Sequence, residues 1–183
     1  MPLRRIVELC LPLHGECGAA TFAPRGGETL EEDWSAWVDE IYRPILAPTL
    51  PPMQDFASNG RFTALLGAEA ALGGALSAQA ARRSLAVGRR VLLDVRPPRG
   101  VKVLDRLRGA ALDNPGVGHL ATVFAVRAHT FHVPVVQSSM VLLFAECVLG
   151  AAAVGLVASF SQAAELLAAA GRATPSAARL IAV

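Results

Sequence analysis

The residues best suited to chemistry lie near the start of the chain, in the segment CLPLHGEC. Cys10, His14 and Cys17 fall within eight residues of one another, and thiolate and imidazole are ligands that Zn²⁺ and Ni²⁺ accept. The spacing matches no known zinc knuckle, and no second Cys/His cluster follows to complete a tetrahedron. We therefore favour cysteines that are small buried hydrophobes, with a metal site on these three residues as an alternative.

Two further groups could carry chemistry, His129 with His132 as a metal-bridging pair and Cys17 with His14 in catalysis, and neither is well placed for it. His129 and His132 are spaced i, i+3, but Pro134 predicts a helix junction, so we expect one turn-region histidine and one that is partly buried. Cys17 has His14 nearby as a base, yet nothing in the sequence orients that histidine. The chain contains no GxSxG, P-loop, GxGxxG or HExxH motif. We expect neither an enzyme nor a cofactor.

Basic residues are concentrated in the middle of the chain. Nine of them lie between positions 82 and 108: Arg82, Arg83, Arg89, Arg90, Arg96, Arg99, Lys102, Arg106 and Arg108. The first fifty residues are the opposite, with eight acids against four arginines. A basic segment can meet nucleic acid, an anionic membrane or an acidic protein. Because the segment has no aromatic residues on which bases could stack, we do not expect nucleic acid as a partner.

The composition excludes a disordered chain. Of the 183 residues, 53% are hydrophobic and 17% are charged, whereas disorder requires low hydrophobicity and high net charge. The three cysteines are an odd set in a chain long enough to fold without disulfides, which indicates a reducing compartment. The N-terminus has no continuous apolar stretch typical of a secretory signal. These features together predict a cytoplasmic protein.

A membrane span has to be considered at 140–160, which has 21 residues and a single charge. That charge, Glu146, falls near the middle, where an acidic residue opposes insertion by about 2.5–3.5 kcal/mol. Alanine and glycine supply little transfer energy to offset it. We therefore predict a buried helix here and consider a membrane unlikely, with a membrane-associated helical protein as an alternative.

The chain is predicted to be all-α, because no segment alternates apolar and polar residues over a useful length. We expect one domain over 1–183, a bundle of about six to eight helices. The predicted helices cover 29–46, about 61–93, 101–112, about 116–128 and a stretch opened by Pro134, with weaker signals at Ser159, Gln162, Gly171, Thr174 and Pro175. Thr29 and Glu32 have capping-box spacing ahead of a tryptophan stripe that should be buried. The prolines at 44, 48, 51 and 52 predict a loop or linker at about 47–60.

Two segments resemble the urease accessory protein UreF family. RRSLAVGRRVLL at 82–93 is similar to a family helix that reads approximately R-x-S-x-x-x-G-R-x-L-L. GHLATVF at 118–124 is similar to the family's G-H-x-x-x-V-F-G segment, with Ala125 in place of the usual glycine. LCLPLHG is similar to the family's opening turn. The chain departs from the family where a Tyr-Ser-Gln-Gly element is expected after that turn, and in lacking the basic, aromatic C-terminal tail.

The resemblance implies an all-α, cytoplasmic, chaperone-like protein without an active site of its own. Such a protein joins a urease accessory GTPase and a second accessory protein in delivering nickel to apo-urease, and a homodimer is expected. It also implies partner-binding candidates: Arg82, Arg83, Ser84, Arg89, Arg90 and His119. By the same resemblance, Ser84 and Gly88 would serve close helix packing, and His119 would begin a core helix. The arginines would face a partner or cap carboxylates.

Overall fold

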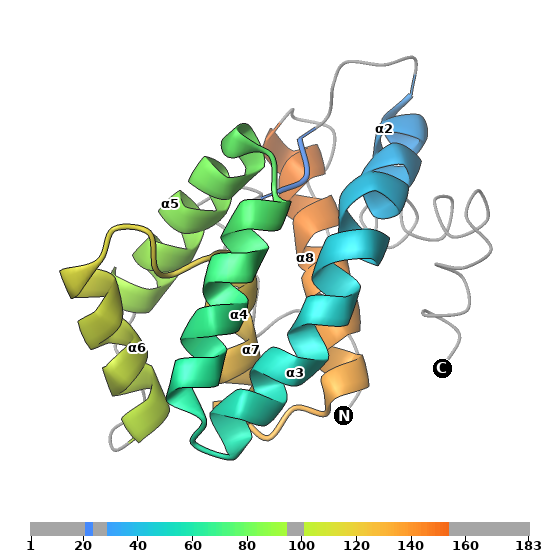
Figure 1. Cartoon of the computed structure of the whole chain (residues 1–183). Helices are drawn as coiled ribbons and strands as arrows, with labels where there is room; N and C mark the ends of the chain where they lie inside the picture. The colour runs from blue at the N-terminus through green and yellow to red at the C-terminus, as the bar shows by residue number, and fades with distance from the viewer. Residues whose placement is uncertain (1–20, 24–28, 95–100, 154–183) are drawn as a thin grey trace.

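A computed structural model describes residues 21–23, 29–94 and 101–153 (Figure 1). These residues form helices and no strand, which confirms the predicted all-α class. In chain order the elements are α2 (Leu30–Trp37), the π-helical η1 (Val38–Leu46), α3 (Ala47–Ser58), α4 (Phe62–Ala75), α5 (Ala78–Asp94), α6 (Lys102–Asp113), α7 (Leu120–Thr130) and α8 (Val135–Ala153). Cys10, His14, Cys17 and the signals between Ser159 and Pro175 lie outside the described residues.

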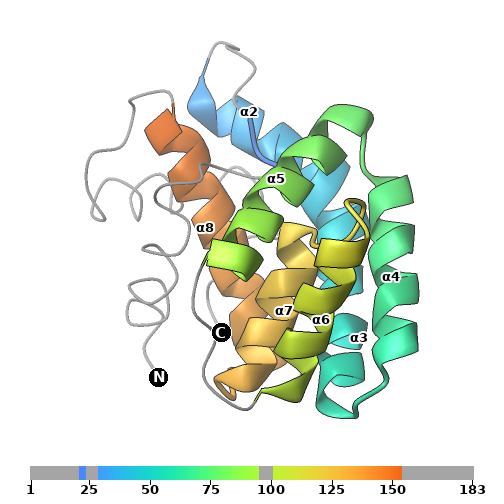
Figure 2. The same ribbon diagram turned by 90° about the vertical axis from the view of Figure 1, so that its left-hand side faces the viewer.

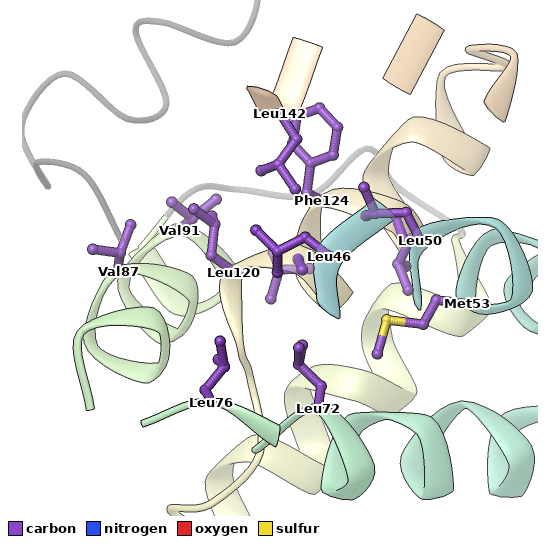
Figure 3. Close-up of a cluster of buried hydrophobic side chains, with 14 of the residues drawn as sticks. Leu46, Leu50, Met53, Leu72, Leu76, Val87, Val91, Leu120, Phe124 and Leu142 are labelled. Carbon is purple, nitrogen blue, oxygen red and sulfur yellow. The ribbon is translucent and has the colours of Figure 1, made fainter. Parts of the chain in front are cut away.

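Helix α7 is the central element of the bundle. It packs mainly against α3 and α5, and Figure 2 shows it enclosed by its neighbours. Seven consecutive residues, 120–126, are buried, as expected for a core helix that is apolar all round. Figure 3 shows how side chains of η1, α3, α4, α5 and α8 meet it in one cluster, with Leu46, Leu72, Val91 and Leu142 around Leu120 and Phe124.

The start of α2 has the predicted capping box. The Oγ1 of Thr29 accepts a hydrogen bond from the backbone N–H of Glu32 at 3.2 Å, and a carboxylate oxygen of Glu32 accepts one from the Thr29 N–H at 3.1 Å. The tryptophan stripe is buried as expected. Trp34 and Trp37 stack with ring centroids 4.9 Å apart.

The predicted linker at 47–60 is wrong, because α3 occupies most of it and continues directly from η1. Apolar residues at helical spacing face the core: Tyr42, Leu46, Leu50, Met53 and Ala57. The prolines at 44, 48, 51 and 52 are exposed or only half-buried, so their lost hydrogen bonds leave carbonyls on the outer face of the helix. The wider π-helical turns around Pro44 also relieve the clash that a proline ring makes with the preceding turn.

The predicted helix at about 61–93 is two helices in the structure. Leu76 is extended, with ψ 148°, and α5 starts after Ser77, whose Oγ accepts a hydrogen bond from the Ala80 N–H at 3.2 Å. Serine is a favoured helix N-cap because its oxygen satisfies an otherwise unpaired donor. This local signal was present in the sequence.

The remaining predicted helices agree with the structure to different degrees. Helix α6 buries Leu104, Leu107 and Ala111 as predicted, and Pro134 does precede α8. The helix expected from about 116 begins only at Leu120, because Gly118 adopts φ +112°, outside the helical region. Over the ranges described, no helix combines the length and apolarity needed to cross a membrane.

Candidate functional site

The two segments that carry the family resemblance pack directly against each other. Gly88 of α5 lies on the backbone just before α7, so closely that a Cβ on it would sit 2.1 Å from the Gly118 oxygen and 2.5 Å from the Leu120 nitrogen. No side chain fits in that space, which explains the glycine in the first segment. We call this contact the helix junction and define it by Glu69, Ser84, Gly88, Arg89, Gly118 and His119.

Ser84 and Arg89 fasten α5 to the other side of the junction. The Ser84 side chain is 1% exposed, and its Oγ accepts a hydrogen bond from the Leu120 N–H at 3.1 Å. The Arg89 guanidinium donates from Nη1 to the carbonyls of Asn114 at 3.1 Å and Val117 at 3.0 Å, and also to that of Ala111. Arg89 therefore holds the α6–α7 connection through carbonyls, rather than facing a partner or capping a carboxylate.

Glu69 of α4 is the member of the junction that the sequence analysis missed. Its carboxylate is 1% exposed and accepts the backbone N–H groups of Gly118 at 2.6 Å and His119 at 2.7 Å, together with the Thr122 hydroxyl. The first N–H groups of a helix lack partners within it, and a negative charge is favourable there. Glu69 thus caps α7 from another helix. The sequence indicated it only by a single acidic residue in the otherwise uncharged segment that forms α4.

His119 begins the core helix α7, as the resemblance implied, and its side chain is 2% exposed. Its Nδ1 is buried and has no hydrogen-bond partner among the residues described. Its Nε2 faces α4, where a Cβ on Gly73 would approach it to 2.9 Å. Burial lowers the pKa of His119 below its ordinary value of 6.5, and the carboxylate of Glu69 opposes that shift.

The six predicted partner-binding residues divide into two groups. Ser84 and His119 are buried and Arg89 is half-buried, and their contacts belong to the helix junction. Arg82, Arg83 and Arg90 are exposed on the outer side of α5, and we call these three the arginine face. Of the six, the residues of the arginine face are those exposed at the surface.

A second buried carboxylate lies on α8. Glu146, 2% exposed, accepts the backbone N–H groups of Thr21 and Phe22, each at 2.9 Å. The indole N–H of Trp37 donates to the Thr21 hydroxyl at 3.2 Å, and Phe22 meets Trp34 edge-on with centroids 5.3 Å apart. The acidic residue that argued against a membrane span is therefore a buried acceptor that holds an N-terminal segment on α8.

The two histidines of the α7–α8 connection lie as expected. His129 is half-buried near the end of α7, and His132 is exposed in the turn with φ +55°. Within the described ranges, no three His, Cys, Asp or Glu side chains are grouped so that they could hold a metal ion. This finding leaves the Cys10, His14 and Cys17 hypothesis open, because those residues lie outside those ranges.

No protein-family model, no curated protein and no solved structure matches this chain. Its function must therefore be inferred from its own residues. The helix junction is buried and positions three helices, while the arginine face presents charge to solvent. The arrangement is suited to organising surfaces for other molecules.

Proposed function

We propose that this chain is a UreF-like scaffold, which joins a urease accessory GTPase and a second accessory protein in delivering nickel to apo-urease. One observation carries the proposal. The motif residues of the resemblance, separated by about thirty positions, are those that the helix junction requires: Ser84, Gly88, Arg89, Gly118 and His119. Residues that meet in one buried contact support a shared architecture better than two isolated short motifs do.

The charge distribution supports a scaffold with two partners. α2 and η1 lie on the side of the molecule opposite α5 and α6 (Figure 1). The first pair carries five acids and one arginine, whereas the second carries seven basic and three acidic residues. Opposite potentials on opposite sides steer partners of opposite charge to separate surfaces. One protein with basic and one with acidic character could thus be held together.

The arginine face is the part of the basic side best suited to a protein partner. Arg82 and Arg83 are each about two helical turns from Arg90, with the small side chain of Ala86 between them on the exposed side of α5. Guanidinium groups form bidentate pairs with carboxylates, which gives geometric specificity as well as attraction. We therefore assign an acidic surface to the partner that docks here.

Reconstitution from purified components tests the proposal. The chain is mixed with the urease GTPase, the second accessory protein and apo-urease from the same organism, and the mixture is separated by size-exclusion chromatography. We expect co-elution and an increase in the nickel content of urease. Arg82→Glu with Arg83→Glu should weaken co-elution at least tenfold, while Arg43→Glu on η1, an exposed arginine on the other side, should not weaken it.

A folded chain that binds none of these proteins would overturn the proposal. The proposal also places the chain in the cytoplasm, as a homodimer. The two alternatives predict other results. A membrane-associated protein would require detergent to stay dispersed, and a metal protein built on Cys10, His14 and Cys17 would contain metal that a Cys10→Ala, Cys17→Ala variant loses.

A further inference from the structure

The connection between α7 and α8 exposes large apolar side chains. Phe131 is 55% exposed and Val136 is 57% exposed, while Pro134 between them is exposed as well. Exposed apolar residues are ordinary when they are scattered, but a group of them is typical of an interaction site. We call Phe131, Pro134 and Val136 the turn surface.

The turn that presents these side chains is held in place from inside. Gln54 of α3 is buried, and its Nε2 donates to the Val133 carbonyl at 2.6 Å. The hydroxyl of buried Ser138 donates to the Gln54 side-chain oxygen at 2.8 Å, and the Val133 N–H donates to the Ala128 carbonyl at 2.8 Å. A surface fixed before binding loses less conformational freedom when it docks.

The turn itself carries a backbone feature that packing must maintain. His132 has φ +55°, a conformation that costs a residue other than glycine of the order of 1 kcal/mol. Strain of this kind persists only where the surroundings determine the backbone, and it is concentrated at functional positions. At this turn, the hydrogen bonds of Gln54 and Ser138 hold the backbone in place.

The charged groups near the turn surface are mainly cationic. The Arg127 guanidinium lies 5.6 Å from the centroid of the Phe131 ring. The turn between α3 and α4 lies at the same end of the bundle (Figure 1), and Arg61 in this turn lies 4.9 Å over the Phe56 ring and 4.0 Å from Asp55. The sequence has no carboxylate from 114 to 145. Arginine and aromatic side chains together are characteristic of energetically important contacts in protein interfaces.

We propose that the turn surface inserts into an apolar pocket on a partner protein, and that carboxylates surround that pocket. The exposed apolar side chains and the nearby arginines determine this choice. A second copy of the chain would bring Arg127 toward the same cationic surroundings, which disfavours self-association through this surface. Naming the partner as one of the urease accessory proteins or apo-urease rests on the proposed function.

Site-specific photo-cross-linking tests this inference. Phe131→p-benzoylphenylalanine and the same substitution at Val136 are compared with that at Ala71 of α4, an exposed control residue outside both the acidic and the basic side. Each variant is irradiated with the purified accessory proteins and apo-urease. We expect cross-links from positions 131 and 136 to one of these proteins and none from 71. Cross-links to a second copy of the chain would overturn the inference.

A binding measurement separates failure of the inference from failure of the proposed function. Phe131→Ser with Val136→Ser should weaken binding to the cross-linked protein at least tenfold, whereas Ala71→Ser should leave it unchanged, and all variants should melt alike because the residues are exposed. Unchanged binding by the double variant would overturn the inference alone. If the unaltered chain binds none of these proteins, that result overturns both the proposed function and this inference.

Discussion

Two carboxylates are buried in the part of the chain that the structure describes, and each accepts two consecutive backbone N–H groups. Glu69 serves Gly118 and His119 at the start of the central helix, while Glu146 serves Thr21 and Phe22, which precede α2 in the chain. The first carboxylate lies where three helices meet. The second fastens a short segment to a helix that is already packed.

The difference shows that equal burial and equal hydrogen bonding need not mean equal importance. Loss of Glu69 leaves unpaired donors at the start of α7. Because the core packs around α7, we expect the stability of the whole fold to decrease. Loss of Glu146 leaves unpaired donors in a short segment, and these can regain water if Thr21 and Phe22 shift, at the cost of exposing part of the buried Phe22 ring. The predictions below test that contrast, from the largest expected effect to the smallest.

Glu69→Ala should destabilise the whole fold by about 3–5 kcal/mol, because it leaves two buried N–H groups and the Thr122 hydroxyl without their acceptor. Urea unfolding followed by circular dichroism measures this loss. Glu69→Gln, which keeps one acceptor oxygen and the same shape, should cost less than half as much. Equal effects of the two substitutions would show that volume, not the hydrogen bonds, matters at this position.

Gly88→Ala should cost about 2–3 kcal/mol, since α5 must move away from the backbone at Gly118 to admit a methyl group. Gly67→Ala on α4 is the matched control, because no atom lies within 4 Å of a Cβ at that position. Alanine is the better helix former, so this control should gain up to about 1 kcal/mol. If Gly88→Ala proves as harmless, the close approach at the junction is not required.

Glu146→Ala should lower global stability by only about 1–2 kcal/mol, within the range for losing satisfied buried hydrogen bonds that can be replaced by water. The main result should be local: faster hydrogen exchange at the Thr21 and Phe22 amides and earlier cleavage near them by a protease. Protection in α7 should stay unchanged. A loss as large as that of Glu69→Ala would remove the contrast between the two carboxylates.

His119 should make stability depend on pH. Burial lowers its pKa in the folded chain below the ordinary 6.5, so the unfolded chain binds more protons between the folded and unfolded values. Stability should therefore be full above about pH 6.5 and fall as the pH drops, by at most about 1.4 kcal/mol per unit from this one group. Urea midpoints across this window should show the slope, and His119→Asn should reduce it. An unchanged slope in the variant would assign the effect elsewhere.

Local signals account for the parts of the fold that could be predicted. The capping box at Thr29 and Glu32, the apolar stripe of α6 and the proline before α8 all act within one or two turns, and all three agree with the structure. The prediction that prolines would break the helix was wrong at α3, because only packing shows on which side of a helix the prolines lie. At α3, the helical spacing of the apolar residues predicts the structure better than the prolines do.

The candidate site could be predicted only in part, because its contacts join distant positions. Glu69 meets His119 across 50 residues and Glu146 meets Thr21 across 125, and no spacing rule connects them. The resemblance did select Ser84, Gly88 and His119 and assigned them helix packing and a helix start, as observed. It could not show that Arg89 turns toward carbonyls while Arg82 and Arg83 remain at the surface.

The prolines of η1 and α3 also act before the chain folds. Each one fixes φ near the helical value, so the unfolded ensemble from 44 to 52 samples fewer backbone states than an ordinary sequence would. Less entropy is lost when this stretch becomes helical, which offsets part of the hydrogen bonding that the prolines remove. The proline-rich segment thus gives up less backbone freedom when it joins the continuous helical path of α2, η1 and α3.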